Sequence, residues 1–191
     1  MPSHLKDNKH FATERFDRQN GEKLHVLTAT GLTGWDFKNT TNSSYENLFK
    51  LCSFLKIPHA QTEELFKRMV FNVIFQNTDD HLKNHSFIYN KEKDSWSLAP
   101  AYDITYSLNP LIDYKKTKRA LSINGKRSDI SLTDLLKVAD AFTIKNPKGI
   151  IRNIEALITD LSILMKEHDI PKAISESINK KVESGRLVHD R

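Results

Sequence analysis

Apolar residues recur at three- and four-residue steps in the middle and in the last third of the chain, which is the spacing of one helix face. A first helix is predicted from Ser43, which stands three positions before Glu46 as in a capping box. A second should begin near Thr62, and because it is apolar over much of its circumference, it is predicted to be the buried centre of the domain. Further helices are predicted from Ser131, from Asn146 with Pro147, and after Pro171.

Two other parts of the chain alternate polar and apolar residues, which is typical of β-strands. In the first, residues 10–15 and residues 23–28 flank the turn signal Gln19-Asn20-Gly21 and are predicted to form a hairpin. In the second, Ser86–Tyr89 and Ser95–Leu98 flank a charged turn. Together these patterns predict a mainly α (α+β) fold with two short β-hairpins.

Composition narrows the class of protein only moderately. The chain has 191 residues, 38% of them hydrophobic, which is enough for one domain or two closely packed lobes with a hydrophobic core. Its net charge of +5 is spread along the sequence and forms no basic arm, so it does not argue for nucleic-acid binding. Cys52 is the single cysteine and no apolar run is long enough to span a bilayer or resemble a signal peptide, so we expect a cytoplasmic location.

Two stretches lack any apolar period and are predicted to be surface loops, residues 30–42 and residues 77–84. The second loop reads NTDDHLKN, and it concentrates acid, base and ligand groups beyond what a simple turn needs. Asp79 stands five positions before Asn84, the separation between the base and the metal-holding amide of a kinase catalytic loop. Asp80 is one position short of that separation and is the weaker candidate for the base.

A kinase also needs a second carboxylate that holds metal, and it follows a short hairpin. The sequence supplies Asp103 at the corresponding place, after the predicted hairpin and within the segment LAPAYDI. A surface Asp after a strand would be the ordinary interpretation of this residue alone. The two segments together are much more specific, and they predict phosphoryl transfer.

The strings NTDDHLKNHSF and WSLAPAYDITYS resemble the catalytic and metal-binding motifs of the HipA family, the bacterial serine/threonine kinase toxins of toxin–antitoxin systems. The string ERFDR, residues 14–18, is similar to that family's connection between its two lobes. The resemblance implies ATP and Mg²⁺ as cofactors and assigns roles to eight residues. By this resemblance Asp79 is the catalytic Asp, His81 and Lys83 line the phosphate side, Asn84 and Asp103 bind Mg²⁺, and Glu14, Phe16 and Asp17 face the nucleotide.

The resemblance also implies how the chain is organised and what it contacts. Residues 1–30 would be the end of the N-lobe with the lobe connection, and residues 31–191 the helical C-lobe. The expected partners are a protein substrate and a helix-turn-helix antitoxin, with DNA contacted only through that antitoxin, or a separate N-lobe. The six glycines form no phosphate-binding motif, so we expect most of the N-lobe to be absent and the chain to be inactive alone.

Two other classes of function stay open at this point. His81 and His85 are four positions apart with Asp79 nearby, which would suit a metal-dependent hydrolase if the segment were helical. No Glu follows His81 in the zinc-protease manner, and a strand is predicted directly after His85. The other alternative is a non-catalytic interaction module, a truncated kinase lobe that binds an antitoxin or a separate N-lobe.

Overall fold

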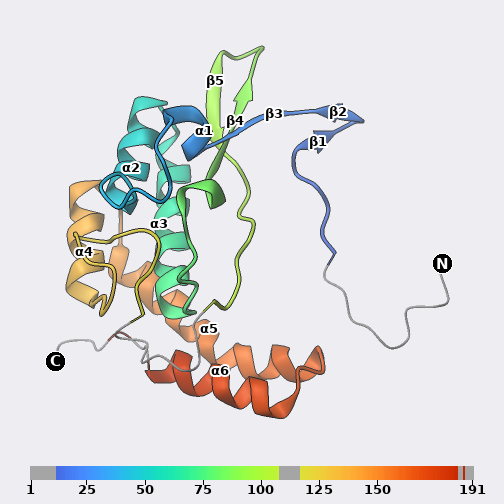
Figure 1. Ribbon diagram of the computed structural model, residues 1–191, viewed down its shortest axis with the longest axis vertical. Helices are drawn as coiled ribbons and strands as arrows, with labels where there is room; N and C mark the ends of the chain where they lie inside the picture. Colours follow the sequence, from blue (N-terminus) through green and yellow to red (C-terminus); the bar gives the residue numbers. More distant parts are fainter. Residues whose placement is uncertain (1–11, 108–116, 185–186, 188–191) are drawn as a thin grey trace.

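The computed structural model describes residues 12–107, 117–184 and 187. Within these ranges a mainly helical body carries a small antiparallel sheet at one end and a helical pair at the other (Figure 1). This confirms the predicted α+β class. The helices are α1 (Ala29–Thr33), α2 (Tyr45–Phe54), α3 (His59–Ile74), the 3-10 turn η1 (Leu82–Asn84), α4 (Leu132–Ala141), α5 (Pro147–Glu167) and α6 (Lys172–Ser184).

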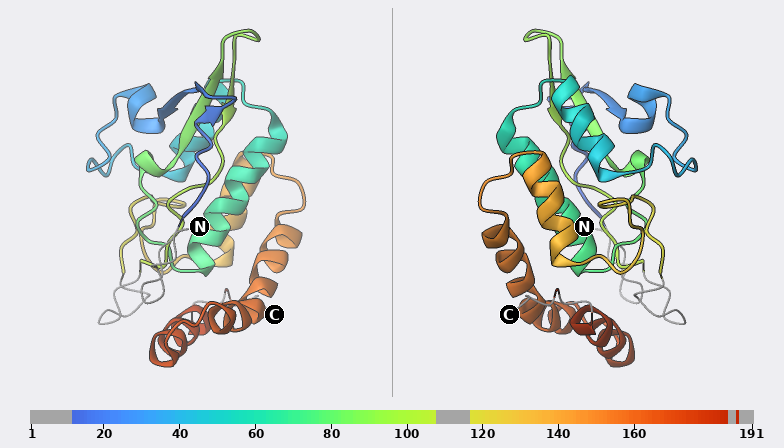
Figure 2. Two further views of the ribbon diagram at one scale, coloured as in Figure 1. Left: turned by 90° about the vertical axis from the view of Figure 1, so that its right-hand side faces the viewer. Right: turned by 90° about the vertical axis from the view of Figure 1, so that its left-hand side faces the viewer.

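Helix α3 is the centre of the molecule, as its apolar pattern predicted. It packs against α2 and α5. Both views of Figure 2 show α3 running through the middle of the helical body. Fully buried side chains line its inner face, and burial at about 25 cal/mol per Å² of apolar surface makes them the main source of stability. These side chains are Leu65, Phe66, Met69, Val70 and Ile74, with Tyr45, Leu48 and Phe49 of α2 beside them.

The strands pair differently from the prediction at the N-terminal end. Strands β1 (Arg18–Gln19) and β2 (Glu22–Lys23) form a hairpin of only two residue pairs, whose turn places Asn20 and Gly21 at positive φ as a tight primed turn requires. Strand β3 (His25–Thr28) does not pair with an earlier strand. It pairs instead with β4 (Ser86–Asn90), which pairs with β5 (Ser95–Leu98), in the order β3-β4-β5.

The hairpin of β4 and β5 is confirmed, whereas the first predicted hairpin was wrong in extent and partner. Residues 10 and 11 of its first strand lie outside the described residues, and residues 12–15 form no strand. Local alternation identifies a strand but carries no information on which distant strand will pair with it.

Helix boundaries differ from the prediction at three places. Helix α1 covers the first four residues of the expected loop 30–42, because Thr28 accepts a hydrogen bond from the Gly31 N–H and Gly34 ends the helix at φ 69°. Helix α2 is capped by Ser44, one residue later than expected, because the Ser43 hydroxyl donates to backbone carbonyls of the preceding loop. Helix α3 begins at His59 directly after Pro58, three residues before Thr62, since proline suits a helix start.

The predicted caps of the later helices are confirmed. Ser131 and Asp134 form a full capping box at the start of α4. Asn146 caps α5 with its side chain and Pro147 occupies the first turn. Helices α5 and α6 pack against each other and form the end of the molecule opposite the sheet (Figure 1).

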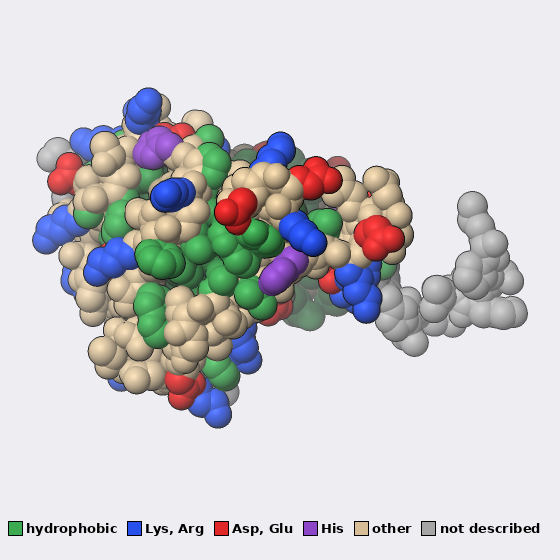
Figure 3. Space-filling model, turned by 90° about the horizontal axis from the view of Figure 1, so that it is seen from above, with side chains coloured by type: hydrophobic (Ala, Val, Ile, Leu, Met, Phe, Trp, Pro, Cys, Tyr) green, Lys and Arg blue, Asp and Glu red, His purple; other side chains and the backbone are tan. Residues whose placement is uncertain are grey.

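Three further observations concern the surface charge, the cysteine and the hydropathy of the helices. Seen from the end that carries the β4–β5 hairpin, basic and acidic side chains are scattered among apolar ones and are not gathered by sign (Figure 3). Cys52 is buried in α2, as predicted, and burial raises the pKa of its thiol to about 12, so it is an unreactive core residue. None of the helices in the described ranges is long and apolar enough to cross a membrane.

Candidate active site

The candidate catalytic loop joins the end of α3 to the start of β4, so a buried helix and a central strand hold its two ends. Asp79 points outward, with its side chain 69% exposed. Its backbone carbonyl accepts hydrogen bonds from the His81 N–H at 2.9 Å and from the Asn84 side-chain amide at 3.0 Å. The loop backbone is therefore tied down while the Asp79 carboxylate stays accessible, which suits a group that must meet a substrate hydroxyl.

Asn84 and Asp103, the two predicted metal-binding residues, line one small cavity together with Asp80, side chains of α3 that include Arg68, and the segment after β5. Its volume is about 10 Å³, room for one water molecule or one small ion. Because the Asn84 amide nitrogen donates to Asp79, the Asn84 side-chain oxygen remains as an acceptor. An amide oxygen with a carboxylate is a donor set that fits Mg²⁺, which keeps its other positions for water and phosphate.

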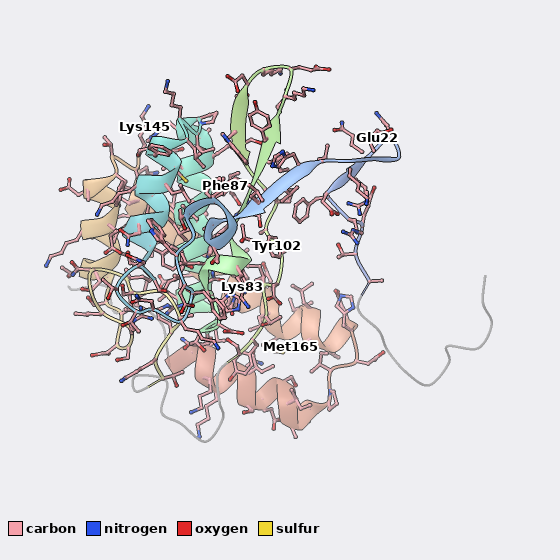
Figure 4. All side chains as sticks on the ribbon, turned by 45° about the horizontal axis from the view of Figure 1, so that its top comes forward. Glu22, Lys83, Phe87, Tyr102, Lys145 and Met165 are labelled. Carbon is pink, nitrogen blue, oxygen red and sulfur yellow. The ribbon has the colours of Figure 1, made fainter. Side chains whose placement is uncertain are left out.

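The segment that carries Asp103 is anchored next to η1. The Tyr102 hydroxyl donates to the Lys83 carbonyl at 2.5 Å and lies 2.5 Å from the Ser86 hydroxyl. Figure 4 shows Tyr102 and Lys83 close together, from the segment after β5 and from η1. Asp103 is exposed with φ 54°, a left-handed backbone conformation that Asp tolerates better than most residues. These contacts bring two residues from separate motifs to one cavity.

His81 and Lys83 meet on the ring of Phe37, which comes from the loop between α1 and α2. The Lys83 ammonium lies 3.8 Å from the centroid of this ring, and the His81 ring meets it edge-on with 5.5 Å between centroids. The His81 Nε2 atom is 4.0 Å from an oxygen of Asp79. Phe37 was missed by sequence reasoning, because it stands in a stretch without any period. Its cation–π contact holds the Lys83 charge beside the catalytic loop.

Of the three residues expected at the nucleotide, only Phe16 has a described contact with the segment that carries Asp103. The Phe16 ring lies 5.6 Å from the ring of Tyr102, which directly precedes Asp103. The Asp17 carboxylate is held by Arg15 and Arg18, each at 2.6 Å, and these contacts outweigh partial burial and lower its pKa to about 2. Glu14 is exposed. Residues 14–18 thus reach the segment that carries Asp103 through an aromatic contact.

Asp80 lies buried beneath the loop, in contrast to the exposed Asp79. It is 1% exposed, and its carboxylate lies 3.3 Å from the guanidinium of Arg119, itself 6% exposed. The Tyr45 hydroxyl donates to the same carboxylate at 2.8 Å and accepts from the Asn72 amide at 2.9 Å. Burial and the neighbouring Asp80 charge raise the pKa of Tyr45 well above its usual value, so it remains a donor.

His85 and His81 do not converge on a common point. His85 is 3% exposed and its ring meets Tyr45 edge-on, while the His81 ring meets Phe37. Burial lowers the pKa of His85 to about 4, so it is neutral at physiological pH. Among the described residues no group of three or more His, Cys, Asp and Glu is placed to hold a metal ion. The hydrolase alternative gains no support from this arrangement.

Comparison with known proteins identifies the family. Residues 2–162 match the model of the HipA-like C-terminal domain. The chain belongs to this family. A protein of Haemophilus influenzae Rd named "Putative kinase" is 33% identical to this HipA-like chain over 111 residues, which cover 52% of this chain and 31% of that protein.

A solved structure supports the same fold. HipA of Shewanella oneidensis MR-1, in a complex with HipB and operator DNA, superposes with a TM-score of 0.67 at 21% identity. The match covers 91% of this chain and 46% of that one. The HipA-like chain therefore spans less than half the length of the relatives it matches, and at this identity the likeness shows the fold alone. The division into residues 1–30 and 31–191 stays a prediction.

Proposed function

We propose that this HipA-like chain is the catalytic lobe of a serine/threonine protein kinase that transfers the γ-phosphoryl group of ATP to a protein hydroxyl with Mg²⁺. The observation that carries the proposal is the common cavity of Asn84 and Asp103. The Asn84 amide donates a hydrogen bond to the backbone carbonyl of Asp79, whose carboxylate is exposed. Phosphoryl transfer needs such an arrangement, because catalysis rests mainly on positioning and charge stabilisation.

Each of these residues has a task that its surroundings support. Asp79 orients the acceptor hydroxyl and takes its proton, and the exposed carboxylate leaves room for that group. Asn84 and Asp103 would hold Mg²⁺, which supplies charge stabilisation for the phosphate oxygens. Lys83 and His81, both fixed on Phe37, place positive and hydrogen-bonding groups on the same side of the loop. Glu14, Phe16 and Asp17 are proposed to border the nucleotide.

Metal binding by the purified chain tests the proposed site. Mn²⁺, a spectroscopic substitute for Mg²⁺, should bind in a water-proton relaxation titration, and Asp103→Asn should weaken that binding about tenfold or more. Asp160→Asn is the matched control, because it removes the same charge from an exposed position on α5. Equal Mn²⁺ affinity in the wild type and in Asp103→Asn would contradict the proposed metal site.

A second test addresses catalysis. The family's phosphate-covering part is not among the motifs of this chain, so we expect no ATP turnover by the chain alone. Turnover by the chain alone that disappears in Asp79→Asn would contradict this expectation while supporting the kinase assignment. With a complementary N-lobe supplied, Asp79→Asn should abolish phosphoryl transfer to a protein yet leave Mn²⁺ binding within about twofold, because Asp79 is the proposed base and not a metal ligand.

A toxin role with an antitoxin partner is also proposed. Its support is the described assembly of the Shewanella HipA with HipB and operator DNA. For this chain we propose a helix-turn-helix antitoxin as partner, with DNA contacted only through it, and a cytoplasmic location. Co-purification with the protein encoded by a neighbouring gene tests the partner, and no complex with that protein at micromolar concentrations would contradict it.

A non-catalytic interaction module is the second candidate, and one observation favours it. An apolar groove of about 390 Å³ lies between α3, α5, α6 and the segment after Asp103. Ile104, Ile170 and Ile174 line this groove and are each more than a third exposed. Exposed apolar side chains around a groove are typical of surfaces that bind other protein segments. Loss of partner binding in Ile174→Ser with Mn²⁺ binding unchanged would assign this role to the groove.

A further inference from the structure

We propose that Ser107 is a positioning residue for the site, one that holds the catalytic loop so that Asn84 presents its oxygen to the metal. Nothing in the sequence motifs assigns a role to Ser107. It lies four residues beyond Asp103, at the end of the segment that runs along the catalytic loop. The inference rests on the proposed function, because it concerns the same metal site.

The Ser107 hydroxyl makes several hydrogen bonds with the catalytic loop. It accepts hydrogen bonds from two consecutive backbone N–H groups, those of Thr78 at 2.7 Å and Asp79 at 3.1 Å. It also donates to the Asn77 side-chain oxygen at 3.2 Å. A single oxygen therefore fixes the orientation of two adjacent peptide groups, one of which belongs to the proposed base. A methyl group in its place would leave both N–H groups without this acceptor.

The effect of Ser107 reaches the proposed metal site through one residue, Asp79, whose N–H and carbonyl belong to successive peptide groups. The Asp79 N–H is bound by Ser107, and the Asp79 carbonyl accepts from the Asn84 amide nitrogen at 3.0 Å. The hydrogen bond to the Asp79 carbonyl fixes the rotation of the Asn84 side-chain amide, and it thereby fixes where the Asn84 side-chain oxygen lies. If Asp79 shifts, the Asn84 amide loses this partner and can rotate, which costs metal affinity because the oxygen is no longer preoriented.

A second set of hydrogen bonds holds the start of the catalytic loop. Removal of the Ser107 hydroxyl should therefore disturb the loop around Asp79 and not the whole loop. On the buried side, Arg119 donates to the Asn77 carbonyl at 3.0 Å and the Ala120 N–H donates to the Thr78 carbonyl at 2.8 Å. These contacts keep the start of the loop in place when the Ser107 hydroxyl is removed. The expected consequence is a local loosening at Asp79 in a protein that remains folded.

The test combines two measurements on three variants of the chain. Ser107→Ala removes the acceptor, Ser107→Thr restores a hydroxyl, and Ser97→Ala is the control, because Ser97 is also partly buried and its hydroxyl makes one hydrogen bond on β5. Hydrogen exchange at Thr78 and Asp79 should become about tenfold faster in Ser107→Ala, as loss of a bond near 1.4 kcal/mol implies. Mn²⁺ affinity should fall roughly fivefold, since Ser107 acts on the proposed metal ligand Asn84 only indirectly, through Asp79.

The outcomes separate positioning from simple stabilisation. Faster exchange and weaker Mn²⁺ binding in Ser107→Ala, both restored in Ser107→Thr and absent in Ser97→Ala, support the inference. Exchange as slow as in the wild type overturns it, and so does faster exchange with unchanged Mn²⁺ affinity, which would make Ser107 a structural residue only. Failure of the wild type to bind Mn²⁺ at all is a different result: it overturns the proposed function, and this inference with it.

Discussion

Two regions of the molecule, the catalytic loop and the helical end, are held together by different interactions. Around the catalytic loop, side chains from α2, α3 and the segments at 107 and 119–121 converge in a buried polar network centred on Asp80. At the helical end, α5 and α6 meet mainly through apolar side chains, with a surface hydrogen bond between Asn179 and Ser162. Several isoleucine and leucine side chains there remain about half exposed, namely Leu157, Ile163, Leu164 and Ile174.

The difference shows where this fold needs a defined geometry and where it does not. Apolar contacts tolerate small shifts, because they depend on area more than on direction. Hydrogen bonds and ion pairs fix both distance and direction, so a buried network restrains the loop to one arrangement. The polar network lies where the proposed chemistry requires fixed positions.

The largest expected effect comes from breaking the network at its centre. Asp80→Ala leaves the Arg119 guanidinium buried without its carboxylate, so the free energy of unfolding should fall by about 3–5 kcal/mol in denaturant titrations. Combining Asp80→Ala with Arg119→Met removes the unpaired charge as well, and this double variant should recover part of the loss. A loss under about 1 kcal/mol in Asp80→Ala would mean that the network contributes little to stability.

A smaller effect is expected at the N-terminus of α4, where a second polar cluster joins this helix to the segment after Arg119. Burial opposes ionisation of Asp134, but hydrogen bonds from Asn124, Ser131 and Lys126 outweigh it and lower its pKa from 3.8 to about 2. The ionised form is thus worth about 2 kcal/mol of stability above the ordinary pKa, and this is lost as the pH falls through the folded value.

Asp134→Asn tests this cluster. The variant should be less stable than the wild type at neutral pH, and the difference between their free energies of unfolding should shrink as the pH falls from about 4 towards 2. Chemical denaturation at several pH values measures it. A difference that stays constant over this range would show that the charge of Asp134 is not responsible.

The smallest effect is expected at the helical end. Ile163 is 55% exposed on α5, so Ile163→Ser should change the free energy of unfolding by no more than about 0.5 kcal/mol. Ile158, five residues earlier on α5 and 2% exposed, provides the contrast, because Ile158→Ala should cost about 2–4 kcal/mol through a cavity. Thermal denaturation of both variants would settle the comparison, and a large loss in Ile163→Ser would reveal that this surface is covered.

Much of the helical fold could be predicted from the sequence, because local rules govern it. The caps at Ser131 and Asn146 and the buried face of α3 follow from residue type and spacing within a few turns. The hairpin of β4 and β5 was equally local. The candidate site residues stood out because two motifs with fixed internal spacing carry them, although their roles remain proposals.

The rest depended on contacts between distant parts of the chain. No local pattern shows that β3 pairs with β4, that Phe37 supports Lys83, or that Arg119 pairs with Asp80. Ser107 is a similar case, since a serine at the end of the segment that carries Asp103 looks like any surface residue until its hydrogen bonds with Thr78 and Asp79 are known. Sequence spacing identified the chemical groups, and only tertiary structure identified what supports them.

The pairing of β3 with β4 has a consequence for how this domain folds. Helices α1, α2 and α3 all lie in the stretch of chain between the two strands, so closing the ladder means closing a long loop. The entropic cost of closing this loop must be overcome before the β3–β4 hydrogen bonds stabilise the fold. The β4–β5 hairpin and the helices form instead from residues that are close in sequence. We therefore expect β3 to join last, which makes completion of the sheet a late step in folding.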